Sequence, residues 1–200
     1  GSHAALKAAV QVTWLPLRVS DLTRQMRECN LIRYAQVADL GAILDIYNDA
    51  ILNTTSVYYY EPHTIGDRLS WYENKVRDGF PVLVFEENNH VIGFATFGLF
   101  RDRPAYKYTV ANSVYVHKDH RGKGVGTRLM IELIKIANER EYATMVAGID
   151  SSNEGSRIMH ENLGFTNCGT VKRVGYKFGK WLDVTFYQYE LRGPATPKEG

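Results

Sequence analysis

The segment from Val114 to Thr127 constrains the fold of this chain more than any other part of the sequence. It begins with an apolar alternating pattern typical of a β-strand, continues as a basic, glycine-rich turn, and ends in a helical pattern. Gly122, Gly124 and Gly126 let the backbone come close to a ligand, and the first amides of the following helix have no partner within it. Such a turn binds anions, and a pyrophosphate fits it well.

Other glycine-rich motifs fit this turn poorly. A P-loop requires a lysine followed by Ser or Thr, whereas Lys123 is followed by Gly124. A dinucleotide-binding fold requires an acidic residue about 20 residues further on, and the next strand here ends too late, at Asp150. Basic side chains crowd the turn and add to the positive helix terminus. These are Lys118, His120, Arg121, Lys123 and Arg128.

Two motifs resemble those of one superfamily. The spacing Arg121-x-x-Gly124-x-Gly126 resembles the acetyl-CoA signature of the GCN5-related N-acetyltransferases (GNAT), and residues 153–165 resemble their fourth-helix motif. Further matches between Leu31 and Leu191 narrow the resemblance to the phosphinothricin and methionine sulfoximine acetyltransferase branch. They are Ile46-Tyr47-Asn48, Glu61-Pro62, Thr109-Val110, Ser113 to Val116 and Gly175 to Val184.

The alternation of strand and helix patterns predicts a single α+β domain with a mixed sheet of about seven strands and helices on both faces. Strands are expected at 31–34, 81–86, 91–100, 108–117, 145–149, 166–176 and 182–191, with a hairpin at 87–90. Helices are expected after a cap at Asp39, from Thr64 to a stop at Gly79, over 126–142, and from Asn153. The resemblance implies that two central strands splay apart and hold acetyl-CoA between them.

The domain is expected to occupy residues 31–192. Gly1-Ser2-His3 is typical of a tag-cleavage remnant and is excluded from the fold argument. Residues 4–30 precede the region of resemblance and are interpreted as a packed extension, an upstream start or a partly ordered tail. Residues 193–200 are expected to form a flexible tail.

Charge and composition exclude several classes of protein. A net charge of +2 gives no general basic field, so nucleic acid is not an expected partner. Cys29 and Cys168 lack the spacing of a disulfide framework or a metal site, so we expect no metal and a cytoplasmic location. No apolar run approaches the ~20 residues of a membrane span. The resemblance implies a homodimer.

The resemblance assigns cofactor contacts to three segments. The backbone at Val114 and Val116 is expected to bind the pantetheine amides. The pyrophosphate is expected on the turn formed by Arg121, Gly122, Lys123, Gly124, Val125, Gly126 and Thr127. Asn153 and Ser156 are expected beside the pantetheine arm. A helix-capping role for Asn153 is an alternative that is compatible with this contact.

Acetyl transfer to an amine requires a neutral nucleophile, an oxyanion-stabilising group and an acid for the departing thiolate. A glutamate commonly follows Thr-Val in the resembled branch, but Ala111 occupies this position and cannot accept a proton. Three interpretations remain: waters gathered by Glu61 or tyrosine hydroxyls, His160 as the base, or acetyl-CoA binding with slow turnover. In many superfamily members the position of His160 holds a tyrosine that acts as the acid for the departing thiolate. Alternatively, His160 is a structural helix residue held by packing or by a contact with Glu161.

Basic and aromatic residues are candidates for binding the acceptor. Two arginines can bind a carboxylate or phosphinate, and the resemblance associates Arg101 and Arg103 with the acidic end of the substrate. A solvated loop is the alternative. Tyr58 aligns with an aromatic residue near the acceptor pocket, whereas Tyr59 and Tyr60 fit an edge or dimer cluster equally well.

The sequence therefore predicts an acetyl-CoA-dependent N-acetyltransferase that acts on the α-amine of a small amino acid or glutamate analogue, such as phosphinothricin or methionine sulfoximine. Direct transfer in a ternary complex is favoured, because neither cysteine is placed as a nucleophile beside a base. The alternatives are an acetyltransferase for peptide or protein N-termini and a non-catalytic acetyl-CoA-binding protein.

Overall fold

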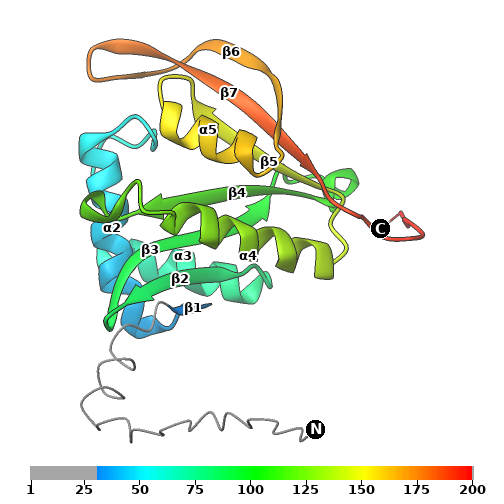
Figure 1. Cartoon of the computed structure of the whole chain (residues 1–200), viewed down its shortest axis with the longest axis horizontal. Helices are drawn as coiled ribbons and strands as arrows, with labels where there is room; N and C mark the ends of the chain where they lie inside the picture. Colours follow the sequence, from blue (N-terminus) through cyan, green and yellow to red (C-terminus); the bar gives the residue numbers. More distant parts are fainter. Residues whose placement is uncertain (1–30, 200) are drawn as a thin grey trace, which may run out of the picture.

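The computed structural model describes residues 31–199, which form an open seven-stranded sheet in the order β1-β2-β3-β4-β5-β7-β6. Helices cover both faces, with α4 and α5 in front of the sheet and α3 behind it (Figure 1). The predicted fold class is confirmed. The tag remnant, the extension 4–30 and Cys29 lie outside the described residues. None of the helices within 31–199 has the length and apolar character needed to cross a membrane.

The elements lie close to their expected positions. The strands are β1 (Leu31–Tyr34), β2 (Val82–Glu87), β3 (His90–Leu99), β4 (Thr109–Val116), β5 (Thr144–Asp150), β6 (Thr166–Lys177) and β7 (Lys180–Glu190). The helices are α2 (Leu40–Asn53), α3 (Ile65–Arg77), α4 (Val125–Glu139) and α5 (Glu154–Asn162). Three short 3-10 turns complete the described chain: η1 (Val37–Asp39), η2 (Pro104–Tyr106) and η3 (Lys118–His120).

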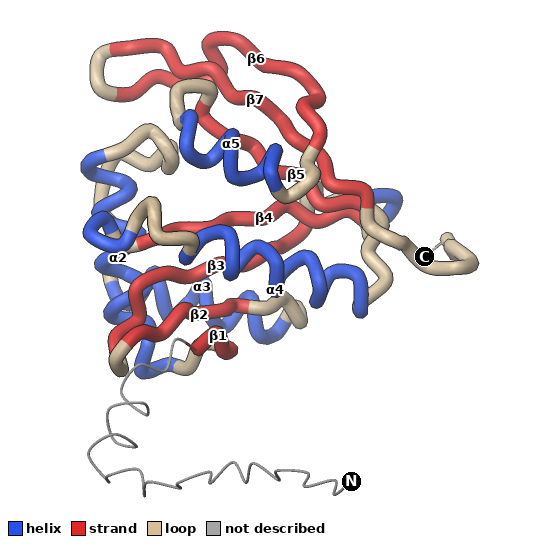
Figure 2. The backbone as a smooth tube through the Cα atoms, viewed as in Figure 1, coloured by secondary structure: helices blue, strands red, loops and turns tan. Residues whose placement is uncertain are grey.

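The two central strands separate, as the resemblance implied. Strands β4 and β5 run parallel and pair only where Thr109–Ala111 lies beside Thr144–Val146. Beyond these residues β4 continues to Val116 and β5 to Asp150 without pairing with each other. Figure 2 shows the two strands diverging in the middle of the sheet, and the opening between them is here called the notch. One edge of each strand therefore keeps backbone groups that no neighbouring strand of residues 31–199 uses.

Local signals set most element ends. Thr64 starts α3 through a capping box in which its Oγ1 accepts from the Asp67 amide at 3.2 Å, and Gly79 follows the helix at φ 75°. The β2–β3 hairpin turns at Asn88 and Asn89, whose φ angles of 51° and 64° match the left-handed turn that such hairpins favour.

The predicted capping role of Asp39 is wrong. Asp39 precedes α2, but its side chain makes no cap hydrogen bond to that helix. The carboxylate instead accepts from the Gln36 amide at 2.7 Å and from Arg33 Nη1 at 2.7 Å. Both Asp39 oxygens bind the Arg33 guanidinium, and such a two-bond pair between full charges is stronger than a single bond to a helix amide, so the carboxylate stays with β1 and does not cap α2.

Side chains alternate across β4 and so divide its residues between the two faces of the sheet. Val114 and Val116 pack against the core on the α4 side, where Leu129, Met130 and Leu133 are fully buried. Tyr115 packs instead against the clusters on the α2 side. The two faces of β4 therefore contact different groups of residues.

Lys177, at the end of β6, connects the sheet to the C-terminal end of α2 through hydrogen bonds. Its Nζ donates to the carbonyls of Ile51, Thr54 and Val57 at 2.5, 3.0 and 2.7 Å. The side chain is buried, at 4% exposure. A cation at a helix C-terminus satisfies carbonyls that the helix itself leaves unpaired and complements its dipole. This contact holds the loop after α2 beside the notch.

Candidate active site

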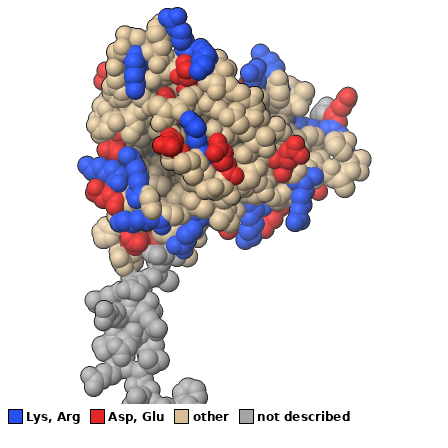
Figure 3. All heavy atoms as spheres, turned by 45° about the horizontal axis from the view of Figure 1, so that its top comes forward, with Lys and Arg blue, Asp and Glu red and all other residues tan. Residues whose placement is uncertain are grey.

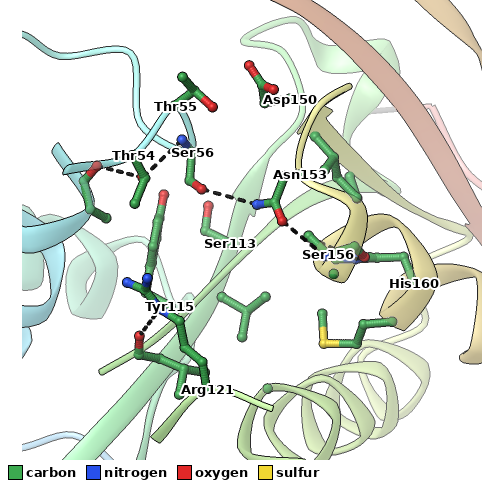
Figure 4. Close-up of a pocket in the computed structure, with 18 of the residues that line it drawn as sticks. Thr54, Thr55, Ser56, Ser113, Tyr115, Arg121, Asp150, Asn153, Ser156 and His160 are labelled. Atoms are coloured by element: carbon green, nitrogen blue, oxygen red, sulfur yellow. Dashed lines mark hydrogen bonds between the residues drawn. The ribbon is translucent and has the colours of Figure 1, made fainter. Parts of the chain in front are cut away.

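A cavity of about 840 Å³ occupies the notch between the splayed strands. Its walls are Asn112 to Val116 of β4, Ala147 to Asp150 of β5, the glycine turn, one side of α5 along its length and the loop after α2. Figure 4 shows these elements converging on the cavity. Ten of the predicted cofactor residues line it: Val114, Val116, Arg121, Gly122, Gly124, Val125, Gly126, Thr127, Asn153 and Ser156. Lys123 does not, and its Nζ donates to the Asp119 carbonyl at 3.0 Å.

The glycine turn presents an uncapped helix N-terminus to this cavity. Gly122 and Gly124 have φ angles of 74° and 79°, a left-handed conformation that glycine adopts without strain. Gly124 precedes α4 and provides no side-chain cap. A Cβ added at Gly126 would lie 3.1 Å from Met159 Sδ, so this position is close to α5 as well. The free amides of the first helical turn and the helix dipole favour an anionic ligand.

We expect Gly124→Ala to weaken acetyl-CoA binding and to lower the free energy of unfolding by about 1–2 kcal/mol, the cost of a left-handed conformation for alanine. Calorimetric titration and urea unfolding would measure the two effects. Gly41→Ala is the matched control, because no atom lies within 4 Å of a Cβ there and alanine is the better helix former in α2. Equal stability and affinity for both variants would contradict the assignment of the turn.

Arg121 is held at the edge of the cavity. Its Nη2 pairs with Asp49 Oδ2 at 3.0 Å and its Nε donates to the Val116 carbonyl at 3.2 Å. The side chain is 47% exposed, so this ion pair contributes little to stability. The guanidinium therefore stays available to an anion at the helix terminus. Figure 4 places it below Tyr115 in the same wall.

Asn153 connects two walls of the cavity. Its Oδ1 accepts from the Ser156 amide at 3.1 Å, so it caps α5, as the structural alternative proposed. Its Nδ2 donates to Ser56 Oγ at 3.1 Å, across to the loop after α2 (Figure 4). The same side chain can cap the helix and contact a bound ligand, because capping uses only the oxygen.

His160 is buried in the wall beside β4, at 1% exposure, and its tautomer follows from its partners. Nδ1 lies 2.8 Å from the Ser156 carbonyl, which only accepts, so Nδ1 carries the proton. Nε2 lies 3.1 Å from Asn112 Nδ2 and accepts from that amide. Burial lowers the pKa of His160, and the bond to the Ser156 carbonyl opposes this shift. The Glu161 carboxylate, the other predicted partner of His160, accepts instead from the Tyr187 hydroxyl at 3.0 Å.

Four predicted residues lie outside the cavity wall. Arg101 and Arg103 are exposed in the loop after β3, where Arg103 Nη1 donates to the Asp102 carbonyl at 2.6 Å. Glu61 is exposed. Tyr58 Oη lies 3.5 Å from Asp150 Oδ2, and burial together with this carboxylate raises the pKa of Tyr58 to about 12. Their proposed roles stay predictions.

A second cavity of about 500 Å³ lies on the other face of the sheet, between α3, the middle of α2, the loop that joins these helices, and strands β3 and β4. Ser113 and Tyr115 line both cavities. Arg68 of α3 lines the second one and is only 2% exposed. Arg68 is not among the site residues that the sequence motifs indicate. The available signal is its spacing of three residues from Trp71, which places a cation on the apolar face of an amphipathic helix.

Residues 44–165 match the acetyltransferase (GNAT) family, and the chain belongs to this family. An L-methionine sulfoximine/L-methionine sulfone acetyltransferase of Salmonella typhimurium is 46% identical over 166 residues, which are 83% of this chain and 97% of that protein.

Two solved structures show the same fold. A phosphinothricin acetyltransferase from Sinorhizobium meliloti in complex with acetyl-CoA has a TM-score of 0.81 and 34% identity, covering 86% of this chain and 93% of that one. A ribosomal-protein-alanine N-acetyltransferase from Brucella melitensis has a TM-score of 0.79 and 45% identity, covering 80% of this chain and 99% of that one.

Proposed function

We propose that this protein transfers the acetyl group of acetyl-CoA to the α-amine of a small amino acid or amino-acid analogue such as methionine sulfoximine or phosphinothricin. The observation that carries this proposal is the notch, which joins open strand edges, an uncapped helix N-terminus and a buried histidine in one cavity. The names of the similar proteins support an amino-acid acceptor.

The residues of the notch fit acetyl-CoA. The backbone of Val114 and Val116 pairs with β3 on one side and has no β5 partner on the other, so it can bind an extended amide-containing arm. Gly124 and the first amides of α4 suit a pyrophosphate. Acetyl-CoA supplies an acetyl group activated as a thioester. The residues around it hold that group in place for an amine that enters beside β4.

His160 is the candidate for moving a proton. Its unprotonated Nε2 accepts from the Asn112 amide, and a lowered pKa keeps the ring neutral at pH 7. This state suits a proton acceptor, direct or through water, better than an acid. The amine has to lose a proton before attack, because a free α-amine is mostly protonated at neutral pH.

Thiol release from acetyl-CoA tests the proposal. The panel contains methionine sulfone, methionine sulfoximine, phosphinothricin and the common amino acids, with acceptor-free reactions as the control. Acceptor-dependent release supports the proposal, and acetyl-CoA binding without release from any acceptor contradicts it. Peptides with an N-terminal alanine belong in the panel, because one similar structure is a ribosomal-protein-alanine N-acetyltransferase. Release only with peptides would establish this second function.

Ala111→Glu is expected to raise turnover if the missing carboxylate limits the rate. Ala111 lies opposite Gly98, and a Cβ at Gly98 would lie 2.6 Å from Lys75 Nζ, so the new carboxylate would have a cation close by. Burial lowers the pKa of Lys75 to about 8. The measurement is kcat with the best acceptor, and Ala111→Gln is the control of equal size. No gain in either variant would indicate that a proton path through water or His160 already suffices.

The homodimer and the cytoplasmic location are also part of this proposal. Exposed apolar side chains gather on β6 and β7, a suitable surface for a second copy of the chain. These are Val171, Val174, Tyr176 and Trp181, with Phe178 in the connecting turn. Basic and acidic residues are mixed on the face shown in Figure 3, without one large basic field. The mass in solution tests the dimer.

A further inference from the structure

Arg68 is a buried cation without an ion-pair partner among residues 31–199. Its guanidinium carbon lies 4.1 Å from the ring centre of Tyr47 and 4.5 Å from that of Trp71. Its Nη2 is 3.5 Å from His63 Nδ1, the longest separation that still counts as a hydrogen bond, and its buried Nε has no partner. Buried charges in proteins are usually paired. This one retains unused donors.

The neighbouring carboxylate of Asp67 is not an ion-pair partner of Arg68. Asp67 also lines the cavity, but its Oδ2 accepts from the amide and the hydroxyl of Thr64 at 2.8 and 2.7 Å as part of the α3 cap. The two aromatic rings hold the guanidinium by cation–π contacts, and the Tyr47 hydroxyl also takes part in a hydrogen bond with it, but the buried Nε is left without a partner. The arrangement is a prepared site for an anion.

The Arg68 cavity and the notch share part of β4 as a wall. Ser113 and Tyr115 line both, so a molecule bound at this part of β4 lies next to both cavities. Arg101 and Arg103 line neither of them. Arg68 is therefore the described arginine that combines burial, free donors and access to the acetyl-transfer site.

We propose that Arg68 binds an anionic group of the acceptor, a carboxylate or phosphinate, and thereby selects acidic amines for acetylation. This inference rests on the proposed acetyl-transfer function. The anion is either the α-carboxylate or an acidic side chain, and both have the planar or paired oxygens that a guanidinium binds through two parallel hydrogen bonds. The neutral rings of Tyr47 and Trp71 would keep water from weakening the pair.

Steady-state kinetics with three acceptors tests the proposal at saturating acetyl-CoA. Methionine sulfone carries only the α-carboxylate, its carboxamide carries no acid, and phosphinothricin carries both acids. Arg68→Met should raise the KM of the acidic acceptor at least about 30-fold, as expected for removal of one partner of a buried charge pair. The KM of the carboxamide and the affinity for acetyl-CoA should stay within about threefold of wild type.

The pattern across acceptors identifies the anion. If Arg68→Met raises the KM of methionine sulfone, the α-carboxylate is the group that Arg68 binds. If it raises the KM of phosphinothricin alone, the acidic side chain is that group. Arg68→Lys should recover part of the preference, because it restores charge but not paired hydrogen bonds. Arg77→Met is the control, because Arg77 lies near the end of the same helix in an exposed pair with Asp78. Equal losses with all three acceptors, carboxamide included, would overturn the proposal.

A binding experiment separates this inference from the proposed function. The wild-type protein and Arg68→Lys are saturated with CoA and titrated calorimetrically with methionine sulfone, phosphinothricin and the carboxamide. Arg68-dependent binding of an acidic compound without turnover would contradict the acetyl-transfer function and support the anion site. Turnover with no preference for an acidic acceptor over the carboxamide in wild type would contradict the anion site and leave the function in place. Circular dichroism confirms that each variant is folded.

Discussion

The His160→Gln variant is expected to lose roughly 10²- to 10⁴-fold in kcat, the usual contribution of a positioned proton acceptor. Nε2 is the unprotonated nitrogen of the His160 ring. Glutamine keeps a polar side chain of similar reach but cannot accept a proton at these pH values. The affinity for acetyl-CoA should change little, because its proposed binding groups are the glycine turn and the open strand edges. Stopped-assay kinetics and calorimetry measure the two quantities.

The pH profile distinguishes catalysis by His160 from a packing role. Burial lowers the pKa of His160, so its neutral form persists below the usual 6.5 and is lost only as the pH falls through the lowered value. As the pH falls, the logarithm of kcat/KM should decrease with slope 1 because the amine becomes protonated, and the slope should steepen to 2 below pH 6.5, where His160 also becomes protonated. The variant should keep slope 1 throughout.

His90→Gln is the control for this experiment. His90 is exposed at the β2–β3 hairpin and lies outside both cavities. It should have the wild-type rate and the wild-type profile. A His160→Gln variant that shows the same two properties would remove His160 from the mechanism and leave proton transfer to water.

Lys177→Met is expected to lower the free energy of unfolding by about 2–4 kcal/mol. The substitution keeps the length of the side chain but leaves the carbonyls of Ile51, Thr54 and Val57 without their donor. Each unsatisfied buried group costs about 1–3 kcal/mol, and removal of a cation whose burial is itself unfavourable offsets part of that cost. Urea unfolding followed by circular dichroism measures the loss. Thr54 also lines the notch, so acetyl-CoA affinity should fall as the loop after α2 loosens.

Lys172→Met provides the matched control on the same strand. Lys172 pairs with Asp183 at 3.0 Å, but its side chain is 73% exposed, and exposed pairs contribute about 0–1 kcal/mol. A Lys177→Met protein as stable as the Lys172→Met protein would show that the three carbonyls find water or other donors.

Elements and motifs with local causes could be predicted from the sequence. The Thr64 cap, the Asn88-Asn89 turn and the glycine turn depend on residues a few positions apart, and each lies where its pattern indicated. The cavity formed between β4 and β5 followed from the family resemblance, because no local pattern shows that two strands separate.

Contacts between distant residues could not be predicted in this way. Lys177 reaches carbonyls 120 to 126 residues away, and nothing in its own neighbourhood indicates this. Asp39 has a good capping position, yet Arg33 competes for its carboxylate once β1 is placed beside it. Arg101 and Arg103 have the right chemistry for an acidic acceptor, whereas the buried guanidinium belongs to Arg68, in a helix.

The alternation of side chains along β4 has a consequence for how this protein can evolve. Asn112, Val114 and Val116 face the cofactor side, whereas Ser113 and Tyr115 face the Arg68 cavity. A substitution of Ser113 or Tyr115 can reshape the Arg68 cavity without altering the packing of Val114 and Val116 against the core on the α4 side. An insertion of one residue would exchange the two sets and destroy both surfaces together. New acceptor specificities are therefore accessible through point mutations in β4, while its length is fixed.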